Sequence, residues 1–99
     1  TDAALRWARE TGGAFDPTFA AVGALWDWKR KPPLVPDAAA IRSALAAVGH
    51  DKVRLDRAAG TIELPAGMRL GLDGLTQGWA VDRAMDIILA AGIRDALVN

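Results

Sequence analysis

Two glycine-bearing stretches of this 99-residue sequence combine residue types that bind nucleotides and anions. The first, Thr11 to Thr18, reads TGGAFDPT and joins two glycines, an aromatic ring, a carboxylate and a proline. The second, Gly71 to Asp82, reads GLDGLTQGWAVD, which has the form of a strand, a glycine turn and a helix start. Amide N–H groups at a helix N-terminus lack partners within the helix and, with the helix dipole, favour an anion. Both stretches are therefore candidate ligand-binding loops.

The glycine spacing of the second stretch is not specific by itself. From Gly71 to Gly78 it is G-x-x-G-x-x-x-G, which differs from the G-x-G-x-x-G of dinucleotide-binding domains, and no P-loop Lys-Ser/Thr pair follows. Thr76 and Gln77 carry side-chain donors for phosphate or carbonyl oxygens. The alternative is a structural strand-to-helix turn in which Gly78 lets the helix pack closely. Both interpretations stay open from this pattern alone.

The first stretch also has a structural alternative. Asp16 precedes Pro17, which biases the Asp16 backbone to an extended conformation and leaves its carboxylate free to accept hydrogen bonds. In the structural interpretation Asp16 caps the next turn, Pro17 takes the first helical position, and Phe15 is a core residue. His50 stands alone, and we expect a surface or satisfied histidine rather than a catalytic one.

Aromatic side chains add a weaker signal. The tryptophans offer flat rings for stacking on a ligand, although we expect most of them to be core or half-buried residues. They stand at Trp7, Trp26, Trp28 and Trp79.

Composition excludes several classes of function. With 12 basic and 12 acidic residues the formal net charge is zero, so nothing steers the chain to nucleic acid or an anionic membrane. There is no cysteine, hence no disulfide or thiolate metal site, and no His, Asp or Glu spacing typical of zinc or calcium. The chain starts at Thr1 without a leader. We therefore expect a piece of a longer protein, with any targeting signal outside it.

Caps and periodicity predict the helices that position the two stretches. Asp2 caps a first helix, which Gly12-Gly13 ends, and part of 19–28 forms a short helix. Three prolines make 29–36 a loop. Asp37 caps the next helix, which Gly49 ends. The apolar stripe of that helix consists of Ile41, Ala44, Leu45 and Val48.

Alternating residues predict strands after Gly49. Residues 53–55 and 61–64 form a hairpin with a loop at 56–60, and 68–72 forms a third strand after a turn. The last helix runs from near Thr76 to Ala91, and another strand begins at 96–99. The apolar stripe of this helix is Val81, Ala84, Met85, Ile88 and Leu89. The predicted fold class is α+β, with helices packed on a small antiparallel meander sheet.

In this order and separation the two stretches resemble the ApbE family, the FAD:protein FMN transferases. In that family a helix ends in TGGAFDPT, and an apolar segment with a Trp, a helix ending in VG, strands, DLGGIAKGYAVD and ALVNxGGD follow. The corresponding residues here are Thr11–Thr18, Trp26, Val48–Gly49, Gly71–Asp82 and Ala96–Asn99. The match stays in register over nearly all 99 residues.

The resemblance implies a magnesium-dependent enzyme that binds FAD. It cleaves the pyrophosphate and joins FMN to a Thr or Ser hydroxyl of a target flavoprotein through a phosphoester. Implied targets are subunits of membrane redox complexes, and the implied location is the periplasm or the outer face of the cytoplasmic membrane, often as a lipoprotein. Residues 1–99 then form a single partial domain, the central segment of a T-fold-like flavin transferase. The N-terminal strands, the metal-site acids and the catalytic residues are expected outside it.

The resemblance also implies site residues. Ala14, Phe15 and Asp16 match the family's first flavin-nucleotide-binding loop. Gly74 falls where some members contribute a metal ligand, here through its backbone carbonyl, and Gln77 takes the place of a common Lys. Replacing a cation by an amide exchanges a charge-assisted hydrogen bond of about 1.5–3 kcal/mol for a neutral one roughly half as strong.

Three further positions of the second stretch have counterparts in the family. The family's first Asp is Gly71 here, and an acid appears two positions later at Asp73, which we take as a cofactor-binding residue. Asp82 matches the acid of YAVD, and Trp79 takes the Tyr position of that motif.

Three functions remain open at this point. The chain is a segment of a flavin transferase and inactive by itself, or it is an FAD-binding module without transferase activity. The third possibility is a ligand-free α+β interaction domain. In an isolated piece the strand at 96–99 would be an exposed edge, so we expect some self-association through it.

Overall fold

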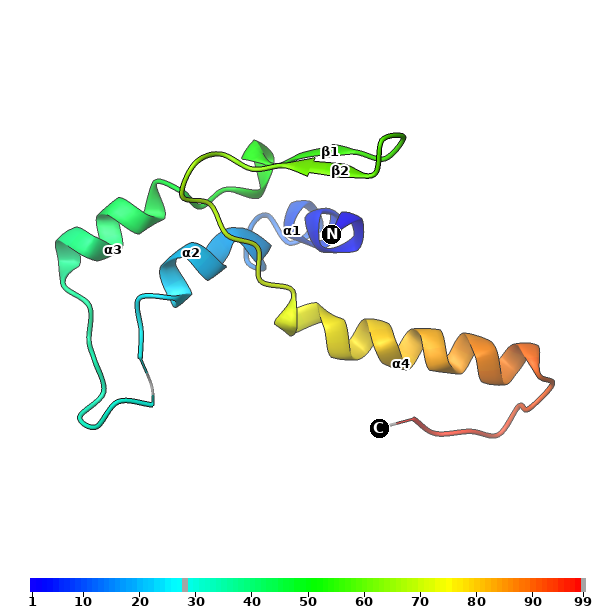
Figure 1. Ribbon diagram of the computed structural model, residues 1–99. Helices are drawn as coiled ribbons and strands as arrows, with labels where there is room; N and C mark the ends of the chain where they lie inside the picture. The colour runs from blue at the N-terminus through cyan, green and yellow to red at the C-terminus, as the bar shows by residue number, and fades with distance from the viewer. Residues whose placement is uncertain (28, 99) are drawn as a thin grey trace.

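Residues 1–27 and 29–98 are described by the computed structural model, in which short helices and one β-hairpin at their edge are followed by a long helix (Figure 1). The fold class is α+β, as predicted. The elements in chain order are α1 (Asp2–Glu10), the 3₁₀ turn η1 (Pro17–Phe19), α2 (Ala20–Gly23), α3 (Ala38–Leu45), the 3₁₀ turn η2 (His50–Lys52), β1 (Arg54–Asp56), β2 (Thr61–Glu63) and α4 (Asp73–Ala90).

The end of α1 leads directly into the first candidate loop. Gly12 and Gly13 have φ values of 60° and 83°, which glycine adopts without the steric penalty of a Cβ. The Gly13 N–H donates to the Ala8 carbonyl at 2.8 Å and the Gly12 N–H to the Arg9 carbonyl at 3.1 Å. This is the Schellman arrangement, and it confirms the glycine pair as the stop of the first helix.

The ends of α3 are also set by local capping. The Asp37 carboxylate accepts the Ala40 N–H at 2.8 Å, which confirms the predicted N-cap. After Leu45 the Lys52 ammonium donates to the carbonyls of Ala46 and Val48, at 3.1 and 2.6 Å. These bonds satisfy carbonyls that the end of the helix leaves without a partner.

The sheet is smaller than the predicted meander. β1 and β2 pair antiparallel with Leu55 opposite Ile62, as predicted for the hairpin. The prediction of a third strand at 68–72 is wrong, because this segment bonds elsewhere: the Gly71 N–H donates to the Pro17 carbonyl at 2.8 Å. The predicted strand at 96–99 is absent over 96–98, where the chain has no neighbouring strand, and Asn99 lies outside the described residues.

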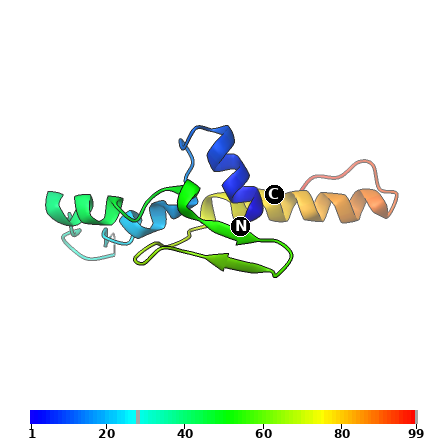
Figure 2. The same ribbon diagram turned by 90° about the horizontal axis from the view of Figure 1, so that it is seen from above.

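Helix α4 begins at Asp73, three residues before the predicted start near Thr76. It extends away from the other helices, and the last residues turn back beside it (Figures 1 and 2). Of the predicted stripe, Leu89 is 52% exposed, while the other members are half-buried. No helix in the described ranges combines the length and apolarity needed to cross a membrane.

The buried core lies where α1 meets η1, α2 and the segment before α4. Its apolar side chains are Ala4, Leu5, Ala8, Val22 and Met68. Arg57 in the hairpin loop forms an ion pair with Asp2, which ties the hairpin to α1. This core fixes the loop that follows α1, which is the first candidate loop.

Candidate functional site

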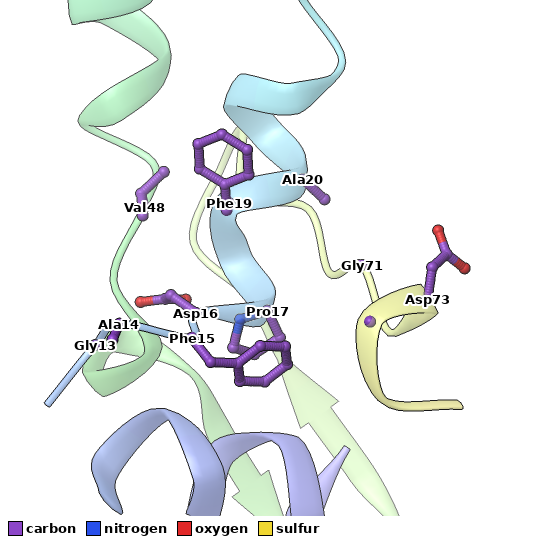
Figure 3. Close-up of a pocket in the computed structure, with 11 residues that line it drawn as sticks. Gly13, Ala14, Phe15, Asp16, Pro17, Phe19, Ala20, Val48, Gly71 and Asp73 are labelled. Carbon is purple, nitrogen blue, oxygen red and sulfur yellow. The ribbon is translucent and has the colours of Figure 1, made fainter. Parts of the chain in front are cut away.

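The two candidate stretches meet and line one groove, although more than fifty residues separate them in sequence (Figure 3). Its volume is about 480 Å³, within the approximate 300–1,000 Å³ of small-molecule sites. The lining residues are Gly13, Ala14, Phe15, Asp16, Pro17, Phe19, Ala20, Val48, Gly71, Asp73 and Gly74. Figure 3 shows Val48 and Asp73 on opposite sides of it.

Gly71 joins the two walls. Besides its hydrogen bond to Pro17, it lies so close to Ala20 that a Cβ at position 71 would stand 3.0 Å from the Ala20 Cβ. On the same side the Phe15 ring reaches α4, with its Cε2 3.5 Å from where a Cβ on Gly74 would be. The absence of a side chain at 71 therefore permits the approach of the second stretch to the first, whereas a Cβ at 74 would make only an ordinary contact with Phe15.

Asp16 caps η1, as the structural interpretation of the first stretch predicted. One carboxylate oxygen accepts the Thr18 N–H at 2.8 Å and the Thr18 hydroxyl at 2.5 Å, and Pro17 occupies the first position of the turn. The backbone of Asp16 is extended, with φ −135° and ψ 113°. This conformation is the one that a following proline favours.

The other carboxylate oxygen of Asp16 bonds to His50, a contact that no sequence pattern predicted. It accepts the His50 N–H at 3.1 Å and lies 3.0 Å from His50 Nδ1. His50 is therefore a satisfied, mostly buried histidine, in agreement with prediction. Its partner was missed because a contact across 34 residues leaves no local pattern in the sequence.

The hydrogen bonds around Asp16 hold it as a carboxylate. Burial alone would raise the pKa of its carboxyl, but the hydrogen bonds from Thr18 and His50 outweigh burial and leave the pKa below its usual value. Asp16 is therefore ionised at neutral pH.

The remaining predicted site residues lie around the start of α4. Asp73 is an exposed residue of the first helical turn and lines the groove, as does Gly74. Gln77 is exposed one helical turn beyond Asp73, on the same side of α4, and is not among the lining residues. The structure thus brings together Ala14, Phe15, Asp16, Asp73 and Gly74, and leaves Gln77 outside the groove wall.

Several lining residues were not singled out as site residues from the sequence. Phe19, Ala20 and Val48 were assigned to helices or apolar stripes, because their residue types carry no chemistry of their own. Val48 reaches the groove because α3 ends at Leu45, before it.

The tryptophans do not line the groove within residues 1–27 and 29–98. Trp7 and Trp79 are 45% and 55% exposed and line a smaller cavity of about 250 Å³ between α1 and α4, together with Arg6 and Asp82. Trp26 is half-buried, and Trp28 lies outside the described residues. In the same ranges no three His, Asp or Glu side chains gather into a metal cluster.

Comparison with known proteins shows the family to which this chain is similar. The sequence model of the ApbE family matches residues 1–99. A relative named FAD:protein FMN transferase, from Treponema pallidum (strain Nichols), is 32% identical over 103 aligned residues, which cover 97% of this chain and 28% of the relative. This chain therefore spans little more than a quarter of that relative.

Two crystal structures resemble the fold over most of its length. The ApbE protein of Thermotoga maritima matches with a TM-score of 0.79 and 32% identity, covering 90% of this chain and 29% of that protein. The apo form of the flavinyl transferase ApbE from Pseudomonas stutzeri matches with a TM-score of 0.77 and 26% identity, covering 90% and 28%.

Proposed function

This chain belongs to the ApbE family, and on that basis we propose that it is the central part of an FAD:protein FMN transferase. Such an enzyme moves FMN from FAD to a Thr or Ser hydroxyl of a target flavoprotein through a phosphoester bond. The observation that carries the proposal is the groove: both family motifs line it, from segments that the chain brings together through Gly71 and Pro17.

The lining suits different parts of FAD in different places. The Phe15 ring offers an apolar face, and Ala14 lets a ligand approach the backbone closely. The Asp73 carboxylate is an acceptor for a hydroxyl or amide N–H of FAD rather than a partner for pyrophosphate, because like charges repel. Gln77 is a neutral donor one turn beyond. Asp16 belongs to the same loop as Ala14 and Phe15 and caps the turn that follows it.

Gly74 is the residue of this chain that we propose as a magnesium ligand. Mg²⁺ prefers oxygen ligands and takes few from the protein when substrate phosphates supply others. A backbone carbonyl has two lone pairs, so the Gly74 oxygen can bind a metal in addition to its helical hydrogen bond. When bound, the metal neutralises charge that develops on the transferred phosphoryl group.

The wider assignment concerns the protein that contains this segment. We propose that the remaining metal ligands and the catalytic residues lie outside these 99 residues, so that the isolated chain does not transfer FMN. By family we further propose subunits of membrane redox complexes as targets, with the enzyme in the periplasm or on the outer face of the cytoplasmic membrane. The groove itself indicates neither the target nor the location.

A direct test uses the full-length protein with FAD, Mg²⁺ and a threonine-containing target peptide. The expected product is a yellow peptide with covalently attached FMN, with AMP released. The same reaction with EDTA, or with a peptide carrying Val in place of the Thr, should give none. If the complete reaction yields no flavinylated peptide, the transferase assignment is wrong.

An FAD-binding module without transferase activity is the second candidate, and the charges at the groove favour it. Within the described residues no cationic side chain lines the groove to neutralise the charge that develops in phosphoryl transfer, whereas two acidic residues, Asp16 and Asp73, do line it. Flavin titration with and without Mg²⁺ separates the two functions. Tight binding without AMP release supports the module, and metal-dependent binding with AMP release supports the transferase.

A further inference from the structure

We propose that His50 is a positioning residue of the flavin groove: it fixes the loop 13–16 by engaging the Asp16 carboxylate together with Thr18. This inference rests on the proposed function, since it assigns a role within the same groove. The observation behind it is a cluster of four residues, Asp16, Thr18, Gly49 and His50, that joins the first candidate loop to the segment that contains Val48.

The carboxylate of Asp16 is fully used by the protein itself. It accepts two hydrogen bonds from Thr18 on one oxygen and faces the N–H and Nδ1 of His50 on the other, at 2.5–3.1 Å. An ionised carboxylate has about four lone-pair sites, so four donors leave none for a ligand. Since the Asp16 side chain is also only 14% exposed, it acts on bound flavin through the shape of its loop.

The network continues through Thr18 to the opposite segment. The Thr18 hydroxyl donates to Asp16 and accepts the Gly49 N–H at 2.8 Å, and Thr18 is fully buried. Gly49 has a φ of 143°, which directs its own N–H and that of His50 to the same side. The segment that contains Val48 is thereby attached to the loop that contains Phe15.

Within this cluster, the contact of the His50 imidazole with the Asp16 carboxylate is the one bond between the two segments that joins two side chains. The other bonds between the segments use the backbone N–H groups of Gly49 and His50. A carboxylate only accepts, so Nδ1 must carry the hydrogen that points to Asp16. The ring also lies near Gly13, since a Cβ placed on this glycine would stand 4.0 Å from Cε1. Loss of the ring therefore removes a donor to Asp16.

The test compares His50→Ala with His50→Asn in the full-length protein, because the Asn amide restores a donor near the position of Nδ1. We expect His50→Ala to raise the KM for FAD about fivefold to tenfold, as loss of one hydrogen bond implies, with kcat within about twofold. His50→Asn should recover most of the loss. Asp51→Asn, on the same turn and exposed, is the matched control and should behave as the wild type.

Amide hydrogen exchange of residues 14–16 and 18 without flavin separates this inference from the proposed function. Faster exchange in His50→Ala, restored in His50→Asn, supports the positioning role even if the wild type fails to transfer FMN. Unchanged exchange and unchanged KM in His50→Ala overturn it while the transferase assignment stands. Equal losses in both variants, or a fall in kcat with KM unchanged, overturn it as well. If His50→Ala does not fold, the comparison of His50→Asn with His50→Gln decides, with the better KM expected for Asn.

Discussion

Thr18 is a buried polar residue whose single hydroxyl serves two partners, as donor to Asp16 and acceptor from the Gly49 N–H. Thr18→Val keeps the shape and removes the hydroxyl, which leaves the half-buried Gly49 N–H without an acceptor. We expect the free energy of unfolding of the full-length protein to fall by about 1–3 kcal/mol. Urea unfolding measures it.

Thr18→Ser is the matched control for this residue because it keeps the hydroxyl and loses a methyl group. It should lower the free energy of unfolding by less than Thr18→Val does. Equal losses in the two variants would mean that packing of the methyl group, rather than the hydrogen bonds, makes Thr18 important.

Asp16 should make stability depend on pH in the acidic range. Its pKa in the folded protein is lowered from the ordinary 3.8, because the hydrogen bonds from Thr18 and His50 outweigh burial. A lowered pKa means that Asp16 stabilises the fold fully above the unfolded value. This stabilisation is lost as the pH falls through the folded value.

Comparison with Asp16→Asn isolates this contribution. The difference in unfolding free energy between the wild type and Asp16→Asn should be constant from neutral pH to about pH 5 and shrink below about pH 4. Urea unfolding at a series of pH values measures it. A difference that stays constant down to pH 2.5 would show that ionisation of Asp16 does not stabilise the fold.

At the scale of elements, the close approach of α2 to the segment before α4 depends on the absence of a side chain at position 71. Gly71 has no positive φ, so a substitution there is resisted by Ala20 rather than by backbone strain. We expect Gly71→Ala to destabilise by about 1–3 kcal/mol, as overpacked contacts do. In an Ala20→Gly background the same substitution should cost clearly less.

The double-mutant cycle of these two positions is measured by urea unfolding and by FAD binding. A coupling of at least about 0.5 kcal/mol is expected for residues in contact. If the effects of the two substitutions are additive, the backbone segments at 20 and 71 move apart without cost. The contact between these positions then does not hold the two walls of the groove together.

The elements also show which parts of the fold the sequence predicts. The end of α1 and the start of α3 were predicted because Gly12, Gly13 and Asp37 act on groups within a few residues of themselves. The predicted end of the second helix at Gly49 is wrong, because α3 already ends at Leu45. The cap at Asp16 is local in the same way. A strand also needs a neighbouring strand, which alternation at 68–72 cannot show. In the structure the Gly71 N–H donates to the Pro17 carbonyl instead of to a strand. The bond from His50 to Asp16 is equally non-local.

The candidate site was predictable to the same extent. Ala14, Phe15, Asp16, Asp73 and Gly74 were identified through motifs, and the structure brings them to one groove. Whether they bind FAD stays a prediction. Gln77 was selected by its position in a motif, but helix geometry carries it one turn beyond the groove wall.

At the scale of the whole molecule the chain is extended and exposes apolar side chains. Its radius of gyration is 17.3 Å, whereas a compact domain of this length has about 13 Å. Trp79, Ile87 and Leu89 on α4 are 52–71% exposed, and Leu97 is 85% exposed. Relatives are more than three times as long, so we infer that other parts of such a protein cover these side chains.

The isolated 99-residue chain should therefore self-associate through α4 rather than through a strand edge at 96–99, which the described residues do not form. Exposed apolar patches of this kind drive association in water. Sedimentation velocity over a range of concentrations should show species larger than a monomer. Replacing Ile87 and Leu89 by lysine should shift the distribution to the monomer.

The control replaces Ala80 and Ala90, which are exposed on the same helix, by lysine and so adds the same charge. If this control dissolves the larger species equally well, charge repulsion explains the effect. A monomer at the highest concentration would exclude α4 as an association surface of the isolated chain.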